Sequence, residues 1–257
     1  MCKMGRHKID RTGEVAYSNN GEKMVIIRYG SRTDIDVEFE DGMIVEHKQY
    51  GNFKIGNVKN PMTASVCGVG FIGKGKFKPY DENGKATKCY NTWVHMLRRC
   101  YDPKYQEKHP TYKGCTVCKE WWNFQVFAEW YYSHYYEFEG QRMELDKDIL
   151  NKGNKIYSVD TCVFVPQFIN TLFTKRDNER GEYPIGVSKN GNKYVALLCK
   201  GNGRPIALGT YPTPTEAFLA YKLAKEQYIK EVAEKYKGKI PQKLYEAMMK
   251  YEVEIDD

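Results

Sequence analysis

The segment of residues 184–226 constrains the fold of this chain more than any other segment. Three short β-type runs, separated by Gly-containing loops, precede one helical pattern. The helix start is fully specified, because Thr213 suits the N-cap, Pro214 the first helical position and Glu216 the third, which together make a capping box. The segment therefore predicts a three-stranded sheet followed by a helix.

The N-terminal part has a β pattern of its own. Residues 34–39 alternate between apolar and acidic side chains, and the Asp41-Gly42 pair tolerates the positive φ angles of a tight turn before a return strand at residues 43–47. The succession of short strands resembles a Tudor-like small β-barrel, which we expect within residues 1–60. Its aromatic side chains fit a core better than a binding face, the candidates being Tyr29, Tyr50 and Phe53.

Residues 61–88 are rich in Gly and Lys. Three glycines, at positions 70, 73 and 75, are spaced like a dinucleotide-binding fingerprint, but Pro79 and Gly84 follow where that fingerprint needs a helix. We therefore predict a linker with a short hairpin.

Two amphipathic helices follow. From Tyr90 an apolar stripe repeats at helical spacing up to Cys100, and a second helix starts near Asn123 and continues a block of ten aromatic residues between Trp121 and Phe138. These aromatics predict a core; stacking of Tyr132, His134 and Tyr136 on unpaired bases is the alternative.

The eight cysteines lack the regular spacing of a disulfide scaffold, so reduced thiols are expected. Cys115 and Cys118 form a C-x-x-C pair, which is half of a tetrahedral Zn²⁺ site. A second pair at the spacing of a zinc finger is missing from the sequence, although Cys100, Cys162 or a histidine could complete the site. Buried thiols are the default prediction, and Zn²⁺ is the alternative.

Several blocks in order carry a family resemblance: YNTWVHMLRRCYD, TYKGCTVCKEWWNFQVFAEWY, LDKDIL and YSVDTCVFVPQFIN. Together with the C-terminal segment they resemble phage-encoded HNH homing-endonuclease-like proteins. The resemblance implies an HNH-like α/β domain at residues 89–182 that binds Mg²⁺ or another divalent cation. By position it implies Asp146 as the strand-end ligand, with Asp148 as the alternative, and Asn170 as the helical ligand.

The general-base histidine of that family is missing. Its position falls on or beside Lys147, and no histidine follows His134 in the chain. A lysine is protonated at neutral pH unless it is strongly desolvated, so the usual mechanism is lost. Three alternatives remain: Asp148 serves as the base, the scaffold is catalytically silent, or LDKD is a solvated turn with local ion pairs.

The C-terminal segment, residues 183–257, resembles the Apetala/ethylene-response-factor DNA-binding domain. The matching residues include Gly186-Val187, Lys193-Tyr194 and the run from Leu208 to Tyr211. In that family the sheet enters the major groove and the helix supports it. Few arginines remain on the sheet here, so contacts to phosphates rather than to bases are expected. The candidate DNA-binding residues are Arg176, Arg180, Lys189, Lys193, Tyr194, Lys200 and Arg204.

The predicted fold class is α+β, with a small barrel, an HNH-like central domain and a C-terminal sheet with a helix. A formal charge of +7 favours a polyanionic partner, and we expect double-stranded DNA rather than a small-molecule substrate. No apolar run is long enough to span a bilayer, so a cytoplasmic location is expected, in the host cell if the chain is phage-encoded. The leading hypothesis is a phage or mobile-element DNA-binding protein. The alternative is a silent phage protein that inhibits a host defence complex.

Overall fold

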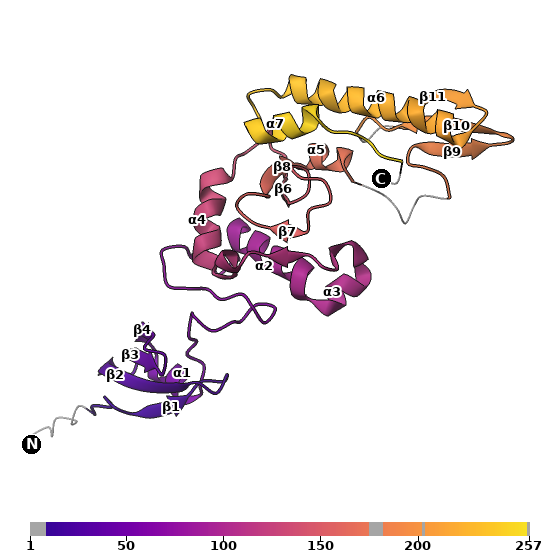
Figure 1. Cartoon of the computed structure of the whole chain (residues 1–257). Helices are drawn as coiled ribbons and strands as arrows, with labels where there is room; N and C mark the ends of the chain where they lie inside the picture. Colours follow the sequence, from indigo (N-terminus) through magenta and orange to yellow (C-terminus); the bar gives the residue numbers. More distant parts are fainter. Residues whose placement is uncertain (1–8, 175–181, 202–203, 256–257) are drawn as a thin grey trace, which may run out of the picture.

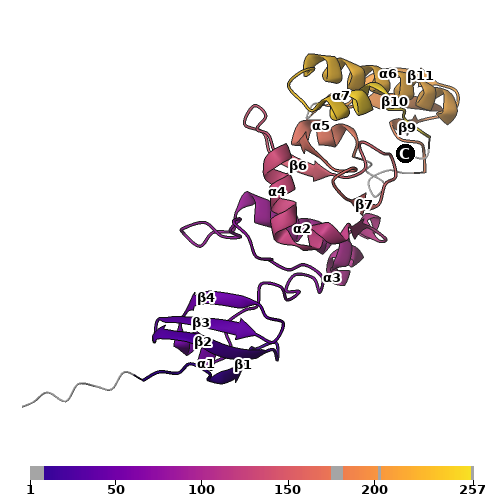
Figure 2. The same ribbon diagram turned by 60° about the vertical axis from the view of Figure 1, so that its left-hand side comes forward.

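The computed structural model describes residues 9–174, 182–201 and 204–255. The fold is mixed α+β, as predicted, and the molecule is elongated, with one sheet at each end and a helical part between them (Figures 1 and 2). Among the described residues, no helix has both the length and the apolar character needed to cross a membrane.

The N-terminal sheet is antiparallel, with its strands in sequence order. They are β1 (Val15–Tyr17), β2 (Lys23–Ser31), β3 (Asp34–Phe39) and β4 (Ile44–Lys48). The predicted hairpin at Asp41-Gly42 is confirmed: Gly42 has a φ of 80°, and the Met43 N–H donates to Asp41 Oδ1 at 3.0 Å.

The prediction of a closed barrel is wrong. No sheet within the described residues closes on itself, and β1 and β4 are the two edges of an open sheet. The short helix α1 (Tyr50–Lys54) follows β4, and Phe53 packs with Met24 and Val37 against the apolar face of the sheet. The helix therefore buries the face that a barrel would bury by closure, and the core assignment of Tyr50 and Phe53 is confirmed.

The central part is built on α2 (Lys88–Tyr101) and α4 (Phe124–His134), which confirms both predicted helices. Thr87 caps α2 and Asn123 caps α4, each through a side-chain oxygen that accepts a backbone N–H of the first turn. The aromatic block forms a core in which Trp93 packs on Phe124, with ring centroids 5.5 Å apart. Smaller elements complete this part: α3 (Pro103–Lys108), η1 (Pro110–Tyr112), β5 (Thr116–Val117) and η2 (Lys119–Trp122).

The Gly/Lys-rich segment that was expected to be a linker packs on this central core. The Phe71 N–H donates to the Trp122 carbonyl, and the Phe124 N–H donates to the Phe71 carbonyl, both at 2.9 Å. A Cβ at Gly70 would lie only 2.4 Å from Leu97 Cδ1, so glycine permits this close approach. The segment thus adds partly buried side chains to the core.

A strand–strand–helix unit follows. β6 (Met143–Asp146) pairs antiparallel with β8 (Val163–Pro166), and α5 (Gln167–Leu172) starts directly after β8. The loop between the two strands contains β7 (Ile156–Tyr157), which pairs in parallel with β5 and ties the loop to the central part. This arrangement places the end of β6 beside α5.

The C-terminal sheet has the order β11-β10-β9, as the sequence predicts for three successive antiparallel strands. The strands are β9 (Val187–Asn190), β10 (Lys193–Leu198) and β11 (Ile206–Tyr211), and α6 (Pro214–Lys235) packs on one face. The predicted cap is confirmed, because Thr213 Oγ1 accepts the Glu216 N–H at 3.2 Å.

The helix α6 extends over two cores. Its first half buries Phe218 and Tyr221 against the three-stranded sheet, whereas its second half buries Ile229 and Ala233 against β8 and α5 (Figure 1). The last helix, α7 (Gln242–Met249), packs in the second core through Leu244 and Met248. The chain reverses after α6 and returns beside the second half of that helix.

Candidate functional site

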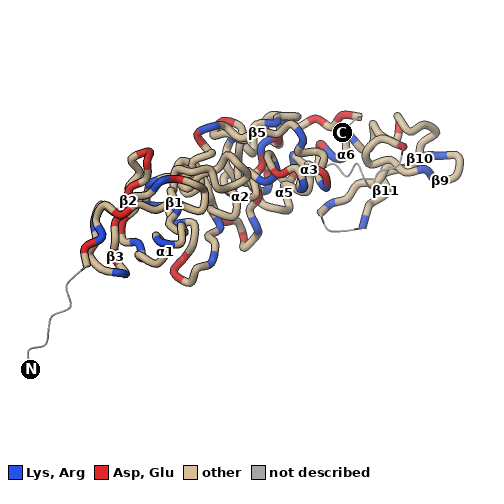
Figure 3. The backbone as a smooth tube through the Cα atoms, turned by 90° about the horizontal axis from the view of Figure 1, so that it is seen from below, with Lys and Arg blue, Asp and Glu red and all other residues tan. Residues whose placement is uncertain are grey.

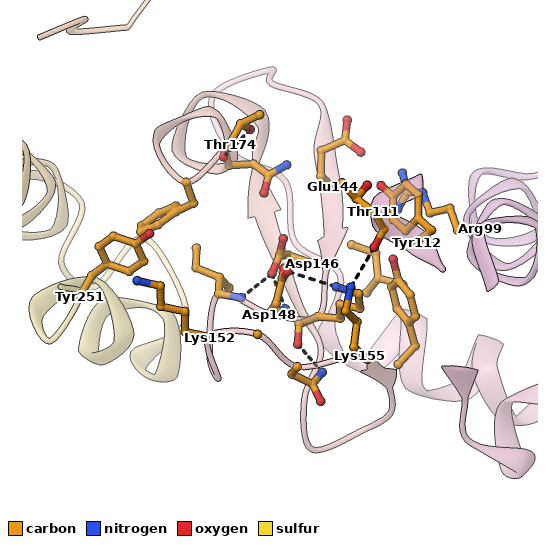
Figure 4. A pocket seen from close by; sticks show the side chains of 18 residues that line it. Arg99, Thr111, Tyr112, Glu144, Asp146, Asp148, Lys152, Lys155, Thr174 and Tyr251 are labelled. Carbon is orange, nitrogen blue, oxygen red and sulfur yellow. Dashed lines mark hydrogen bonds and ion pairs between the residues drawn. The ribbon is translucent and has the colours of Figure 1, made fainter. Parts of the chain in front are cut away.

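A cavity of about 410 Å³ opens where the end of β6 meets α5. Its wall comes from distant parts of the chain, including the end of α2, η1, the loop after β6 and the residue Tyr251 beyond α7 (Figure 4). All four residues predicted for catalysis or metal binding lie in this wall: Asp146, Lys147, Asp148 and Asn170.

Asp146 ends β6 and starts a tight turn. Its Oδ1 accepts the backbone N–H groups of Asp148 at 2.9 Å and Ile149 at 2.7 Å. Burial raises the pKa of Asp146 to about 6, and the nearby carboxylate of Asp148 acts in the same direction. The ionised form of this side chain is therefore energetically costly near neutral pH, and a bound cation would stabilise it.

Lys147 is buried, with 7% of its surface exposed. Its ammonium lies 3.1 Å from Asp148 Oδ2 and 5.8 Å from the ring centroid of Tyr157. The ion pair with Asp148 agrees with the local ion pairs of the third alternative for LDKD, but the burial of Lys147 contradicts a solvated turn. A protonated amine held in this way has no lone pair with which to accept a proton from water.

Asn170 lies on α5 and lines the same cavity as the β6 turn. Within the residues that the structure describes, its side-chain amide has no hydrogen-bond partner. Asp146 Oδ2 likewise accepts no hydrogen bond there, since both N–H contacts use Oδ1. One carboxylate oxygen and one amide oxygen are thus available in the same cavity, which is the oxygen donor set that Mg²⁺ takes together with water and phosphate.

Asn154 was missed by the sequence reasoning. Its Nδ2 donates to the carbonyls of Lys147 and Ile156, both at 2.7 Å, and so closes the loop that carries Asp148. Thr161 Oγ1 also donates to the Ile156 carbonyl at 2.7 Å, so the two side chains share this bracing role. The only sequence pattern that could have indicated this role is the position of Asn154 two residues before Ile156, the first residue of β7.

Three cationic side chains in the wall were also missed: Arg99, Lys152 and Lys155. Lys152 lies 3.1 Å from Glu254, and Lys155 donates to the Thr111 carbonyl at 2.9 Å. These residues come from α2 and from the loop after β6, so no local sequence motif connects them.

The predicted DNA-binding residues do not share one face of the C-terminal sheet. Lys189 and Tyr194 are directly opposite in the β9–β10 pair, which puts their side chains on the same face. Tyr194 packs in the core beneath α6 and edge-on against Tyr183, so this is the face that the helix covers. Lys193 is on the other face, opposite Asn190.

Lys200 and Arg204 flank the sheet. The Lys200 ammonium lies 5.0 Å from the ring centroid of Tyr228 and 4.0 Å from Glu231, so it faces α6. Arg204 is exposed. Arg176 and Arg180 lie outside the described residues. Along the described chain, basic and acidic residues are interspersed, with Lys189 and Lys193 on the β9–β10 hairpin (Figure 3).

The seven cysteines within the described residues are free thiols. Cys100, Cys115 and Cys162 are buried in or beside the central core, and burial raises the pKa of Cys100 and Cys162 to about 12. In the described part of the chain, no group of three potential ligand side chains that includes Cys115 or Cys118 has its ligand atoms within 4.8 Å of one another. The geometry gives no support to the zinc alternative.

One such group lies at the other end of the molecule: Asp34, Asp36 and His47. The Arg28 guanidinium forms ion pairs with both carboxylates, 2.8 Å from Asp34, and His47 Nδ1 is 2.9 Å from Asp34. Arg28 lowers the pKa of Asp34 to about 2. The Arg28 guanidinium thus already offsets one of the two carboxylate charges of this cluster.

The chain was compared with known protein families, with curated proteins and with solved structures, and none of them matched.

Proposed function

We propose that this chain is a DNA-binding protein of the HNH homing-endonuclease-like class that hydrolyses phosphodiester bonds with one divalent cation. The observation that carries the proposal is the meeting of a strand-end carboxylate, Asp146, and a helical amide, Asn170, in one cavity. Both have an oxygen that accepts no hydrogen bond within the described residues, and β6, β8 and α5 place the strand end and the helix in one unit. The proposed cation is Mg²⁺ or a similar ion held by these two oxygens.

Asp148 is the proposed base. Its side chain is 49% exposed and lies two residues from Asp146, so water in the cavity can reach it. A carboxylate is a weaker base than an imidazole, and the Lys147 ammonium contacts Oδ2 of Asp148 at 3.1 Å. Slow hydrolysis is therefore expected in comparison with a histidine-based site.

The C-terminal module is the proposed means of attachment to DNA. Lys193, on the face of the sheet that α6 leaves uncovered, and the exposed Arg204 would contact phosphates, whereas Lys189 lies on the opposite face. Lysines act as point charges and position the duplex rather than specify bases. Binding should therefore depend weakly on sequence and strongly on salt.

Incubation of supercoiled plasmid with Mg²⁺ or Mn²⁺ tests the proposed hydrolysis. The wild-type chain should nick the plasmid, Asp146→Ala should abolish the nicking, and Asp160→Ala, an exposed aspartate outside the cavity, should leave it unchanged. Equal activity of wild type and Asp146→Ala would contradict the metal-site assignment.

The ion pair between Lys147 and Asp148 favours a second candidate function. If the ammonium permanently neutralises the carboxylate beside the metal position, the scaffold is silent, and the chain would act as a phage protein that blocks a host defence complex. Absence of nicking with either cation, together with a DNA affinity that falls little with salt, would favour this candidate over the first.

A further inference from the structure

Arg99 stands out among the cations of the cavity. It lies in the last turn of α2 and is partly buried, with its guanidinium carbon 5.4 Å from the ring centroid of Tyr112. Its neighbour Arg98 points elsewhere, is about half exposed and forms an ion pair with Asp102 at 3.1 Å. Within the described residues, Arg99 has no carboxylate at ion-pair distance.

The aromatic neighbours of Arg99 do not neutralise it. Burial raises the pKa of the Tyr112 and Tyr157 phenols above the usual value, so both are uncharged at neutral pH. The guanidinium keeps its full positive charge in a partly desolvated position. The Tyr157 hydroxyl hydrogen-bonds to the guanidinium but is neutral, so it is no counter-ion. A buried charge without a counter-ion is costly, and an anion that enters the cavity would reduce this cost.

A second cation lies on the same side of the cavity. Lys155 is exposed, and its ammonium donates to the Thr111 carbonyl at 2.9 Å. Figure 4 shows Arg99, Tyr112, Thr111 and Lys155 together on one side, and Asp146 and Asp148 beside them. The other two lysines of the wall, at positions 147 and 152, are already paired with carboxylates. Glu144 lies on the Arg99 side as well, but its carboxylate is paired with Arg142, 2.9 Å away. The charge that remains available on this side is therefore positive.

We propose that Arg99 and Lys155 form a phosphate-binding subsite that holds a backbone phosphate of the nucleic acid next to Asp146. This inference rests on the proposed function, because it assigns the substrate group that the cavity takes. A guanidinium offers a planar fork of donors that matches two phosphate oxygens, and the ammonium adds a third donor. A phosphate held here would share the cavity with the carboxylate side, where the proposed cation binds.

The probe for this subsite is thymidylyl-thymidine, which contains one phosphodiester, with thymidine as the control that lacks it. Binding to the full chain is measured by NMR in EDTA, so that no divalent cation takes part. The dinucleotide should bind more tightly than thymidine, and Arg99→Gln should weaken its binding about tenfold, which corresponds to about 1.4 kcal/mol. The affinity of Arg99→Lys for the dinucleotide should lie between those of the wild type and Arg99→Gln, since lysine keeps the positive charge but lacks the planar fork of donors. Arg98→Gln, the adjacent control, should change the affinity less than about twofold.

Several results would overturn the subsite. They are equal affinity for the dinucleotide and thymidine, or unchanged affinity in an Arg99→Gln chain whose circular dichroism is that of the wild type. If Arg99→Gln does not fold, Lys155→Gln replaces it, because Lys155 is exposed and its loss leaves the core intact. Unchanged affinity in that variant would also contradict the proposal.

The plasmid assay separates this inference from the proposed function. Absence of cleavage together with Arg99-dependent binding of the dinucleotide would remove the hydrolytic function and leave the phosphate subsite. Cleavage that needs Asp146 but is unaffected by Arg99→Gln, with dinucleotide binding also unaffected, would remove the subsite and leave the hydrolytic function.

Discussion

Replacing Asp146 with asparagine should stabilise the metal-free protein at neutral pH and have no such effect in acid. The carboxylate at this position is partly desolvated and faces Asp148, so it is costly to ionise. Asparagine has nearly the same shape, and its Oδ1 can still accept the two backbone N–H groups that Asp146 Oδ1 accepts in the wild type. The substitution therefore removes the charge and keeps the turn.

The magnitude follows from the shift in pKa. The pKa rises from 3.8 to about 6 in the folded chain, and each unit corresponds to about 1.4 kcal/mol, so ionisation costs up to about 3 kcal/mol of folding free energy. The folded state holds the proton more tightly than the unfolded state. The wild type therefore loses this stability as the pH rises from about 4 through about 6, and it is not affected by this group below that range.

Urea unfolding followed by tryptophan fluorescence measures the effect. All four tryptophans lie in or against the central core, which also contains Leu145, the neighbour of Asp146. At pH 7.5 in EDTA, Asp146→Asn should be more stable than the wild type by up to about 3 kcal/mol, and at pH 3.5 the two should be equal. The exposed Asp160→Asn variant is the control, with no comparable gain expected at pH 7.5.

A stability difference between wild type and Asp146→Asn that is the same at both pH values would refute the reasoning, because it would show a packing effect instead of a charge effect. A titration of the Asp146 carboxyl carbon by NMR gives an independent check. A titration midpoint near 4 instead of near 6 would also refute the charge effect.

The remaining predictions concern the loop, the metal and the C-terminal module. Asn154→Ala should lower the free energy of unfolding by about 1 to 2 kcal/mol, because the Lys147 carbonyl loses its side-chain donor while the Ile156 carbonyl keeps Thr161 Oγ1, and an unchanged stability in urea unfolding would contradict the bracing role. Mn²⁺ should raise the Tm of the wild type at pH 7.5 but not that of a chain with asparagine at position 146; equal shifts in calorimetry would point to binding elsewhere. Gly186→Ala should destabilise the C-terminal module by more than about 1 kcal/mol, since φ is 75° and the new Cβ would lie 2.1 Å from the Tyr221 ring; unchanged hydrogen exchange in β9 and β10 would contradict this. Lys193→Ala should weaken binding of any duplex about equally and reduce its salt dependence, whereas Lys200→Ala, whose ammonium faces α6, should have less effect in a fluorescence anisotropy titration.

Local structure in this chain could be predicted from the sequence where the signal is itself local. The cap at Thr213, the turn at Asp41-Gly42 and the apolar stripes of α2 and α4 depend on residues a few positions apart. No local sequence pattern indicated that the N-terminal sheet would stay open instead of closing into a barrel. Closure would require the two edge strands to pair across the whole domain, and α1 covers the apolar face instead.

The candidate site shows the same division. Asp146, Lys147 and Asp148 are contiguous, and Asn170 was placed by the order of blocks that the resemblance follows. Arg99 could not be found in this way. Arg98 and Arg99 are equivalent in the sequence, and only the packing of α2 against η1 and β7 turns the second of them toward the cavity.

The face of the C-terminal sheet on which each basic residue lies could be predicted only in part from the sequence. Strand alternation puts Lys189 on the face of Val187, which is apolar, and puts Lys193 on the other face. The orientation of Lys200 toward Tyr228 depends on where α6 lies over the sheet, which the sequence of the strands alone does not determine.

The length of α6 has a consequence for how the chain would act on a duplex. Its contact with the C-terminal sheet is centred near Phe218 and its contact with the strand–strand–helix unit near Ala233. An unbroken helix rises about 1.5 Å per residue, so the fifteen residues between these two contacts correspond to about 22 Å. With base pairs about 3.4 Å apart, that separation is six to seven base pairs, roughly two thirds of a helical turn. The helix α6 would thus fix the distance along the duplex between the site of DNA attachment and any site of cleavage. Lengthening α6 by one helical turn should move the cleavage position by about one to two base pairs.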